Sequence, residues 1–269
     1  MIQLRTFIFT SVMIPWILSS TVNNKYMDTR KSKRDVEIFD NYDVPQVSNT
    51  DQKVAKKPKE MPTCLLCVCL IGSVYCEEVS PEMSAVPTLP KETTYLYARF
   101  NKITKISNHD FANMATLRKI DLTGNLITEI QDGAFLKLPN LEELNLAENR
   151  LTKLPTLPTK LYLFDASNNR LKTQGVKATI FKKLTRLTYL YLGNNKLIAV
   201  PQLPESLQVV HLQYNKISTI TDETFCDGND SYYIRTNMDE VRLEGNPIKL
   251  SLHPNSFICL HALPIGWYD

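Results

Sequence analysis

The sequence predicts a solenoid of the α/β type, in which short parallel strands stack into a curved sheet and disulfides cap both ends. Three observations predict this fold. Leucine and asparagine recur in one motif between about residues 93 and 250, the six cysteines lie towards the two ends of the repeating region, and the segments between repeats are either proline-rich or carry a phenylalanine. We therefore expect a sheet on the concave side, opposite a convex side of irregular, polyproline-II and 3-10 segments.

The repeated motif is L-x-x-L-x-L-x-x-N-x-L, the pattern of a leucine-rich repeat. Four copies match it closely, over residues 117–127, 141–151, 187–197 and 207–217, and three looser copies with Asn101, Asn169 and Asn246 bring the total to seven. The alternating apolar residues are expected to point inward from a short strand, because strand side chains change face at every residue. Each strand is followed by an asparagine, and the seven are Asn101, Asn125, Asn149, Asn169, Asn195, Asn215 and Asn246.

We expect these asparagines to form a hydrogen-bonded ladder along the solenoid. An amide side chain both donates and accepts, so it can satisfy backbone groups that are left open where the strand turns. Loss of one rung should leave buried backbone groups unpaired, at a cost of about 1–3 kcal/mol.

The segments between the strands are of two kinds. Short ones, such as 154–158 and 200–204, are rich in proline, which suits an extended convex segment because proline fixes φ and lacks a donor. Longer ones carry a phenylalanine, and these rings are expected to stack as an aromatic spine: Phe111, Phe135, Phe181 and Phe225. The widest spacing between ladder asparagines, residues 215–246, predicts an extra loop.

Cysteines lie where a solenoid needs caps, since its end repeats would otherwise expose apolar faces. Four cluster near the N-terminus as Cys64-x2-Cys67-x-Cys69-x6-Cys76. We expect a cysteine cap over residues 61–92, and an outsized repeat with a C-terminal cap over 218–269 that a Cys226–Cys259 disulfide closes. Spacing alone leaves three pairings open for the clustered four. A tetrathiolate zinc site is the alternative, and the even cysteine count of an exported chain argues against it.

Residues 1–20 are expected to be a secretion signal. An apolar stretch from Phe7 to Leu18 follows the single early charge of Arg5 and precedes small residues. Polar residues interrupt this stretch, and it is shorter than the about 20 apolar residues of a membrane span, so an uncleaved anchor is the weaker interpretation. Residues 21–60 are polar and are expected to be disordered.

Three short features indicate modification or contact. Acidic residues around Tyr42 suit tyrosine sulfation, and a solvated tail explains them equally well. The basic run 30–34 suits cleavage after Arg34, a heparin-like contact, or no role beyond a solvated charge run. Asn229 begins the one N-glycosylation sequon, in the expected extra loop, whereas no Ser-Gly dipeptide offers an acceptor for a chondroitin or dermatan chain.

The composition argues against a nucleic-acid binder and against an enzyme. The 31 basic and 28 acidic residues nearly balance, which disfavours a one-sided basic field. The four histidines fit no metal-ligand spacing and lie near no nucleophile motif. We therefore expect no catalytic site, no metal and no cofactor.

In such a solenoid, the strand residues between the inward leucines form columns on the concave face. The central column comprises Tyr97, Asp121, Asn145, Asp165, Tyr191, His211 and Arg242, and the flanking column contributes Tyr95, Glu143 and Tyr189. Tyrosines and charged groups on a rigid sheet are common in protein-binding surfaces. We expect the four tyrosines to be exposed and the middle to be acidic, which suits an extended basic partner such as collagen. A solvated sheet face without a partner is the alternative.

The cap pattern, the short count of repeats and the wide penultimate repeat resemble those of the class III small leucine-rich repeat proteoglycans. The resemblance covers roughly residues 60–269, and the stretches 61–70, 242–248 and 253–260 carry it in detail. It implies the pairings Cys64–Cys69 and Cys67–Cys76, and it places the bridge of the family's wide repeat on Cys226–Cys259.

The resemblance also implies a secreted protein of the extracellular matrix that binds collagen fibrils or growth factors. It suggests a part in bone and connective tissue formation with transforming growth factors beta, and a keratan sulfate chain or a plain glycan at Asn229. One alternative is a growth-factor-like or receptor-directed ligand that acts on cells directly. A structural role in setting fibril diameter is another.

Overall fold

The computed structural model describes residues 62–228 and 232–269. The predicted signal 1–20, the segment 21–60 with Tyr42 and the basic run, and the sequon at Asn229 lie outside the described residues. Within the part that is described, no helix is long and apolar enough to cross a membrane.

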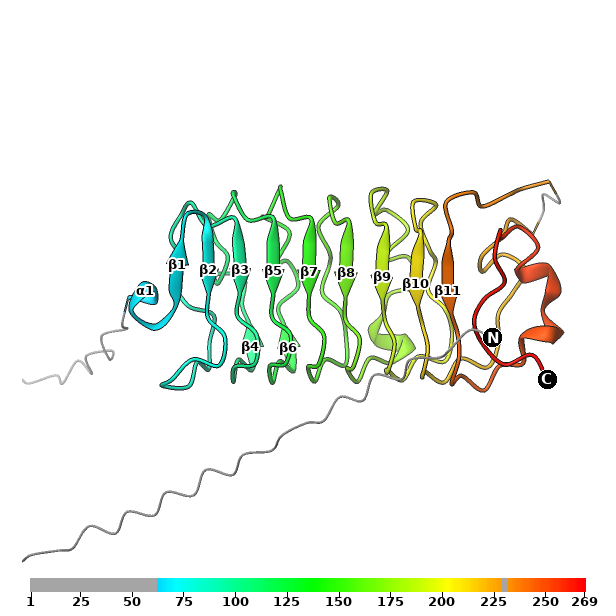
Figure 1. Cartoon of the computed structure of the whole chain (residues 1–269), viewed down its shortest axis with the longest axis horizontal. Coiled ribbons are helices and arrows are strands. Elements are labelled where there is room, and N and C mark those ends of the chain that lie inside the picture. Colours follow the sequence, from blue (N-terminus) through cyan, green and yellow to red (C-terminus); the bar gives the residue numbers. More distant parts are fainter. Residues whose placement is uncertain (1–61, 229–231) are drawn as a thin grey trace, which may run out of the picture. The chain divides into compact units, whose positions relative to one another are not determined.

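The described part is built on a nine-stranded sheet, whose strands lie side by side in Figure 1. It begins with the short helix α1 (Thr63–Leu66) and an antiparallel hairpin of β1 (Val68–Leu70) and β2 (Ser73–Tyr75). Seven parallel strands follow: β3 (Tyr95–Tyr97), β5 (Lys119–Asp121), β7 (Glu143–Asn145), β8 (Leu163–Asp165), β9 (Tyr189–Tyr191), β10 (Val209–His211) and β11 (Glu240–Arg242). The predicted leucine-rich-repeat solenoid is confirmed.

The connections between the strands are mostly turns, as the sequence predicts for the convex side. Two of them pair as β4 (Lys105–Ile106) and β6 (Glu129–Ile130), which form a separate two-stranded parallel sheet. Three 3-10 turns occur in the described residues: η1 (Thr173–Gly175), η2 (Leu250–Leu252) and η3 (Pro254–Ser256).

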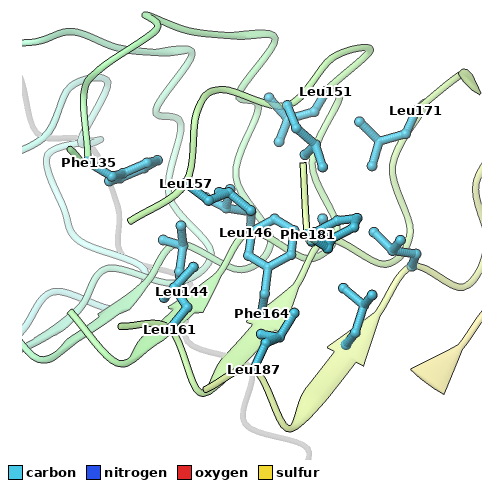
Figure 2. Close-up of a cluster of buried hydrophobic side chains, with 14 of the residues drawn as sticks. Phe135, Leu144, Leu146, Leu151, Leu157, Leu161, Phe164, Leu171, Phe181 and Leu187 are labelled. Carbon is cyan, nitrogen blue, oxygen red and sulfur yellow. The ribbon is translucent and has the colours of Figure 1, made fainter. Parts of the chain in front are cut away.

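The core lies between the sheet and these connections. The middle residue of each parallel strand points into it, and all seven are at most 4% exposed: Leu96, Ile120, Leu144, Phe164, Leu190, Val210 and Val241. Figure 2 shows the centre of this core, where Leu144 and Phe164 from neighbouring strands meet leucines of the connections. Burial of each such side chain contributes about 1.5–3 kcal/mol, so each coil is stabilised chiefly by its neighbours.

The prediction of one continuous phenylalanine spine is wrong, because the rings contact one another only in pairs. Phe111 and Phe135 lie 5.7 Å apart between ring centroids, whereas Phe181 packs at 6.0 Å against Phe164 of β8. The short repeats bring no phenylalanine to the convex side, so the buried Leu157 occupies that layer between Phe135 and Phe181 (Figure 2).

The seven asparagines after the strands make closely similar hydrogen bonds. Nδ2 of Asn149 donates to Leu122 O of the preceding repeat at 2.9 Å and to Leu146 O of its own repeat at 3.1 Å. Its Oδ1 accepts from the backbone N–H of Ile127 at 2.9 Å. Five of the remaining six repeat this arrangement with their own neighbours. Asn101 keeps both bonds to the preceding coil, with Cys76 O and Val79 N, but within its own repeat it donates to Arg99 O. The ladder therefore ties each coil to the one before it.

Disulfides lie near both ends of the sheet. They join Cys64 to Cys69, Cys67 to Cys76, and Cys226 to Cys259, which is the pairing that the resemblance implied. At the C-terminal end, Ile265 pairs with β11 through hydrogen bonds from Leu243 N to Ile265 O and from Ile265 N to Val241 O, at 2.7 and 2.8 Å. The chain's tail thus covers the last edge of the sheet.

Candidate binding surface

The outward side of the nine-stranded sheet presents the first and third residues of each strand, and we call this surface the sheet face. Its members align across the sheet because each strand pairs with the next without a shift, as in Tyr95 with Lys119 and Tyr97 with Asp121. The third-position column is Tyr75, Tyr97, Asp121, Asn145, Asp165, Tyr191, His211 and Arg242. The first-position column is Ser73, Tyr95, Lys119, Glu143, Leu163, Tyr189, Val209 and Glu240.

The N-terminal third of the sheet face is an aromatic and cationic cluster. The rings of Tyr75 and Tyr97 stack with centroids 4.9 Å apart and planes 2° from parallel. Nζ of Lys119 lies 5.4 Å from the Tyr97 ring centroid and 2.7 Å from a carboxylate oxygen of Glu143. Lys119 is therefore held by a ring and a carboxylate, which orders this part of the surface.

Asp121 lies at its predicted place on the sheet face, but its carboxylate contributes little to the acidic middle that we expected there. The residue is only 5% exposed. Its Oδ1 accepts from both the backbone N–H and the hydroxyl of Thr123, at 3.1 and 2.7 Å. Oδ2 is near Nδ2 of Asn145 at 3.4 Å and Nε of Arg99 at 3.9 Å. Asp121 thus stabilises the turn after β5, and its neighbours cover it.

Asp165 occupies the equivalent place on β8 and is half-buried. Its Oδ1 accepts from the backbone N–H of Ser167 at 2.8 Å. Burial raises the pKa of Asp165, hydrogen bonds from Ser167 lower it, and the negative charge of Asp121 raises it, so that the pKa lies above its ordinary value. The middle of the sheet face is consequently less acidic than the sequence indicates.

The C-terminal third contains a histidine between an aromatic ring and an acid. The His211 ring meets the edge of Tyr191 with centroids 4.8 Å apart, and its Nε2 is 3.2 Å from Oε1 of Glu240. The pKa of Tyr191 is raised above its ordinary value, mainly because the hydroxyl is partly buried. Arg242, the last member of the column, pairs with Glu244.

The expectation that all four tyrosines are exposed holds for Tyr95 alone, which is 37% exposed, because Tyr97, Tyr189 and Tyr191 are half-buried. Neighbouring rings cover them. Tyr75 stacks on Tyr97, the edge of Tyr162 meets Tyr189 at 5.1 Å, and His211 meets Tyr191. Such packing fixes the side chains in place, so that their remaining exposed edges form a rigid surface.

Two tyrosines of this surface were missed by the sequence reasoning. Tyr75 extends the central column because β2 of the cap hairpin joins the parallel sheet, and the cap sequence lacks the repeat motif that would signal it. Tyr162 lies one residue before β8, and only its ring contact with Tyr189 places it beside the column.

The charged side chains on and beside the sheet face are mostly paired with one another. Its cations are largely neutralised by adjacent acids, as in Arg99 with Glu77 and Lys119 with Glu143. Within residues 62–228 and 232–269, no cluster of three or more histidine, cysteine or acidic side chains is arranged to hold a metal ion.

The sheet, the ladder and the two caps together define a leucine-rich repeat protein. A family model described as Leucine rich repeat matches residues 115–157. A chain of the solved octameric complex of Latrophilin 3 (Lec, Olf), Unc5D (Ig, Ig2, TSP1) and FLRT2 (LRR) is similar, with a TM-score of 0.57 and 24% identity. That likeness covers 75% of this chain and 58% of the other, and at such low identity it shows the fold alone.

Sequence relatives identify the family. Mimecan of Homo sapiens is 56% identical over 258 residues, which are 94% of this chain and 86% of the relative. Mimecan of Coturnix japonica is 61% identical over 81% of this chain and 75% of the relative, and Epiphycan of Gallus gallus is 50% identical over 77% and 65%. The chain belongs to the mimecan family, a group of small leucine-rich repeat proteoglycans of the extracellular matrix.

Proposed function

We propose that the chain is a secreted binding protein without catalytic activity, which engages collagen fibrils, and growth factors associated with them, through its sheet face. The observation that carries the proposal is the row of ordered tyrosines in register on one rigid sheet. Tyrosine is enriched among the residues that dominate binding energy, because it offers a large contact area and has few rotamers to lose.

The shape of the row favours an elongated partner. The third-position column crosses eight strands, from Tyr75 to Arg242, and therefore spans about 34 Å at the usual spacing of about 4.8 Å between strands. Tyr75 and Tyr97 lie at one end of this column and Tyr191 lies towards the other, with Tyr189 beside it in the first-position column. A collagen triple helix lying across the strands would contact both groups at once.

The charges of the sheet face indicate what kind of partner it suits. Its acids are either paired with cations or shielded, so the face offers hydroxyl groups, ring edges and ordered ion pairs. Such a surface suits a partner rich in backbone carbonyls and in mixed charges, as collagen is. The contribution to bone and connective tissue formation with transforming growth factors beta belongs to this proposal, as do a glycan at Asn229 and sulfation of Tyr42.

Binding of the full chain to reconstituted collagen fibrils tests the proposal. We expect the double variant Tyr97→Ala, Tyr191→Ala to bind at least tenfold more weakly, since two central aromatic contacts cost about 1–2 kcal/mol each when truncated. The matched control is Tyr214→Ala, Tyr232→Ala, which removes two exposed tyrosines outside the two columns of the sheet face and should bind within twofold of the parent. Equal affinity of the parent and the first variant would exclude the sheet face as the collagen site.

A further inference from the structure

A second surface follows the asparagine ladder along one edge of the solenoid. The residue directly after each of four consecutive ladder asparagines is basic and exposed: Arg150, Arg170, Lys196 and Lys216. Their backbone N–H groups all donate to the preceding coil, as in Arg170 N to Leu151 O at 2.9 Å and Lys196 N to Leu171 O at 2.8 Å. The four residues therefore occupy the same place in successive coils. With the adjacent exposed Lys172, we call them the basic edge.

The basic edge has one member directly after the ladder asparagine in each of four successive coils. Leu151 and Leu171, which directly follow Arg150 and Arg170, lie side by side in Figure 2. Successive coils are about 4.8 Å apart at the strands, so the four cations are spread over about 15 Å. A shallow depression lies between the first two, lined by Arg150, Arg170 and Asn168, with Glu148 as the acid in its wall.

The charge of this region is not balanced locally, although that of the whole chain nearly is. Residues 149–204 contain one acid, Asp165, which lies half-buried on the sheet face. The same stretch contains ten basic residues: Arg150, Lys153, Lys160, Arg170, Lys172, Lys177, Lys182, Lys183, Arg186 and Lys196. The solenoid therefore carries a strongly positive middle.

Among the residues that the structure describes, no carboxylate oxygen lies within 4 Å of a charged nitrogen of the basic edge. On the sheet face, by contrast, Lys119 and Arg242 each pair with a carboxylate, as does Arg99 just after β3. The ion pairs of the described part of the chain are formed by six other basic residues: Arg99, Lys105, Arg118, Lys119, His211 and Arg242.

Two members of the basic edge even face each other. Lys172 and Lys196 are paired across neighbouring coils as partners in a parallel β-bridge. Like charges directly opposite each other destabilise a sheet. A polyanion that lies along these coils would be attracted by both ammonium groups at once.

We propose that the basic edge binds a linear sulfated polysaccharide of the extracellular matrix. Such a chain carries sulfate groups at short intervals, and guanidinium and ammonium groups bind such oxyanions through charge-assisted hydrogen bonds. The residues directly before the ladder asparagines of these coils are Glu148, Asn168, Asn194 and Tyr214, so one exposed aromatic ring lies beside Lys216. Proteins that bind single-stranded nucleic acid usually stack successive bases on several aromatic rings, and no such series follows the four cations. The basic edge is separate from the sheet face, so a polysaccharide and a protein partner can be bound together.

The test compares heparin binding by the full chain with that of two variants that lose the same charge. The site variant is Arg150→Gln, Arg170→Gln, Lys196→Gln, Lys216→Gln. The control variant is Lys91→Gln, Lys137→Gln, Lys182→Gln, Lys183→Gln, all exposed residues of the turns that precede strands. We expect the site variant to bind at least tenfold more weakly at near-physiological salt. The slope of log affinity against log salt should become shallower by about three, as four lost contacts predict from counterion release.

The outcomes separate the proposal from its rivals. The control variant should stay within threefold of the parent. A third variant, Arg150→Lys, Arg170→Lys, Lys196→Arg, Lys216→Arg, should restore binding, which shows that the charges act and not a change of fold. Equal weakening of the site and control variants would mean diffuse attraction and would overturn the site, as would a parent that does not bind heparin. Binding of single-stranded DNA of matched charge as tightly as heparin would overturn the assignment to a sulfated polysaccharide.

Discussion

Replacement of Asn149 by alanine provides a quantitative test of the asparagine ladder. The side chain makes bonds to Ile127 N, Leu122 O and Leu146 O. After its removal, each of the two carbonyl oxygens still accepts a hydrogen bond from a neighbouring asparagine. Nδ2 of Asn125 donates to Leu122 O at 3.0 Å, and Nδ2 of Asn169 donates to Leu146 O at 2.9 Å. The N–H of Ile127 loses its partner and stays buried.

The expected loss of stability follows from this difference between the orphaned N–H group and the two carbonyls. One orphaned buried N–H costs about 1–3 kcal/mol and the lost second bonds to the carbonyls add about 1 kcal/mol, for a total of about 2–4 kcal/mol. For a folded part of this size, each kcal/mol lowers the melting temperature by about 2–4 °C, so the variant should melt about 4–16 °C lower.

Thermal unfolding followed by far-UV circular dichroism measures the effect. The control is Glu148→Ala, the adjacent exposed residue, whose φ of 55° is equally strained with either side chain. We expect the control to melt within about 2 °C of the parent, as surface substitutions usually do. Equal melting temperatures for the two variants would refute the reasoning that the ladder satisfies otherwise unpaired backbone groups.

Three further predictions concern the sheet face, the C-terminal cap and a close approach between coils. The raised pKa of Asp165 means that the folded protein binds a proton more tightly than the unfolded chain, so stability falls as pH rises through the unfolded and then the folded pKa. Asp165→Asn should therefore raise the melting temperature at pH 7 and have little effect below pH 3.5, and an equal effect at both pH values would contradict the burial argument. The double variant Cys226→Ser, Cys259→Ser opens a loop of separation 33 and should lose about 3–4 kcal/mol in chemical denaturation, with an unchanged midpoint as the contrary result. A Cβ on Gly175 would lie 2.0 Å from the backbone oxygen of Thr152, whereas one on Gly193 meets only the flexible end of Gln213, so Gly175→Ala should destabilise by about 1–3 kcal/mol more than Gly193→Ala in the same assay.

The sequence predicts the repeating part of this fold well, because a strand that buries every second residue leaves its period in the chain. The inward positions around Leu144 and the asparagines after the strands follow from that period alone. The cap hairpin has no such period, so the addition of Tyr75 to the central column became visible only in the structure.

Features that depend on contacts between coils are harder to predict. Asp121 is shielded by Thr123 of its own coil and Asn145 of the next coil, a contact that the repeat motif does not reveal. The phenylalanine spine is interrupted because the buried Leu157 takes the place of a ring between Phe135 and Phe181. The basic edge can be predicted from the sequence, because the residue after each ladder asparagine is known once the repeat is aligned. The near-zero net charge of the whole chain concealed it, because acids elsewhere offset the positive middle.

Photo-cross-linking from the sheet face tests most directly that the ordered strands form the surface that binds collagen. A benzophenone amino acid placed at Tyr97 in the full chain, mixed with collagen fibrils and irradiated, should form a covalent product with collagen, while the same group at the exposed Tyr232 should form little. Cross-linking from Tyr232 with none from Tyr97 would contradict the account and place the contact on another side of the solenoid.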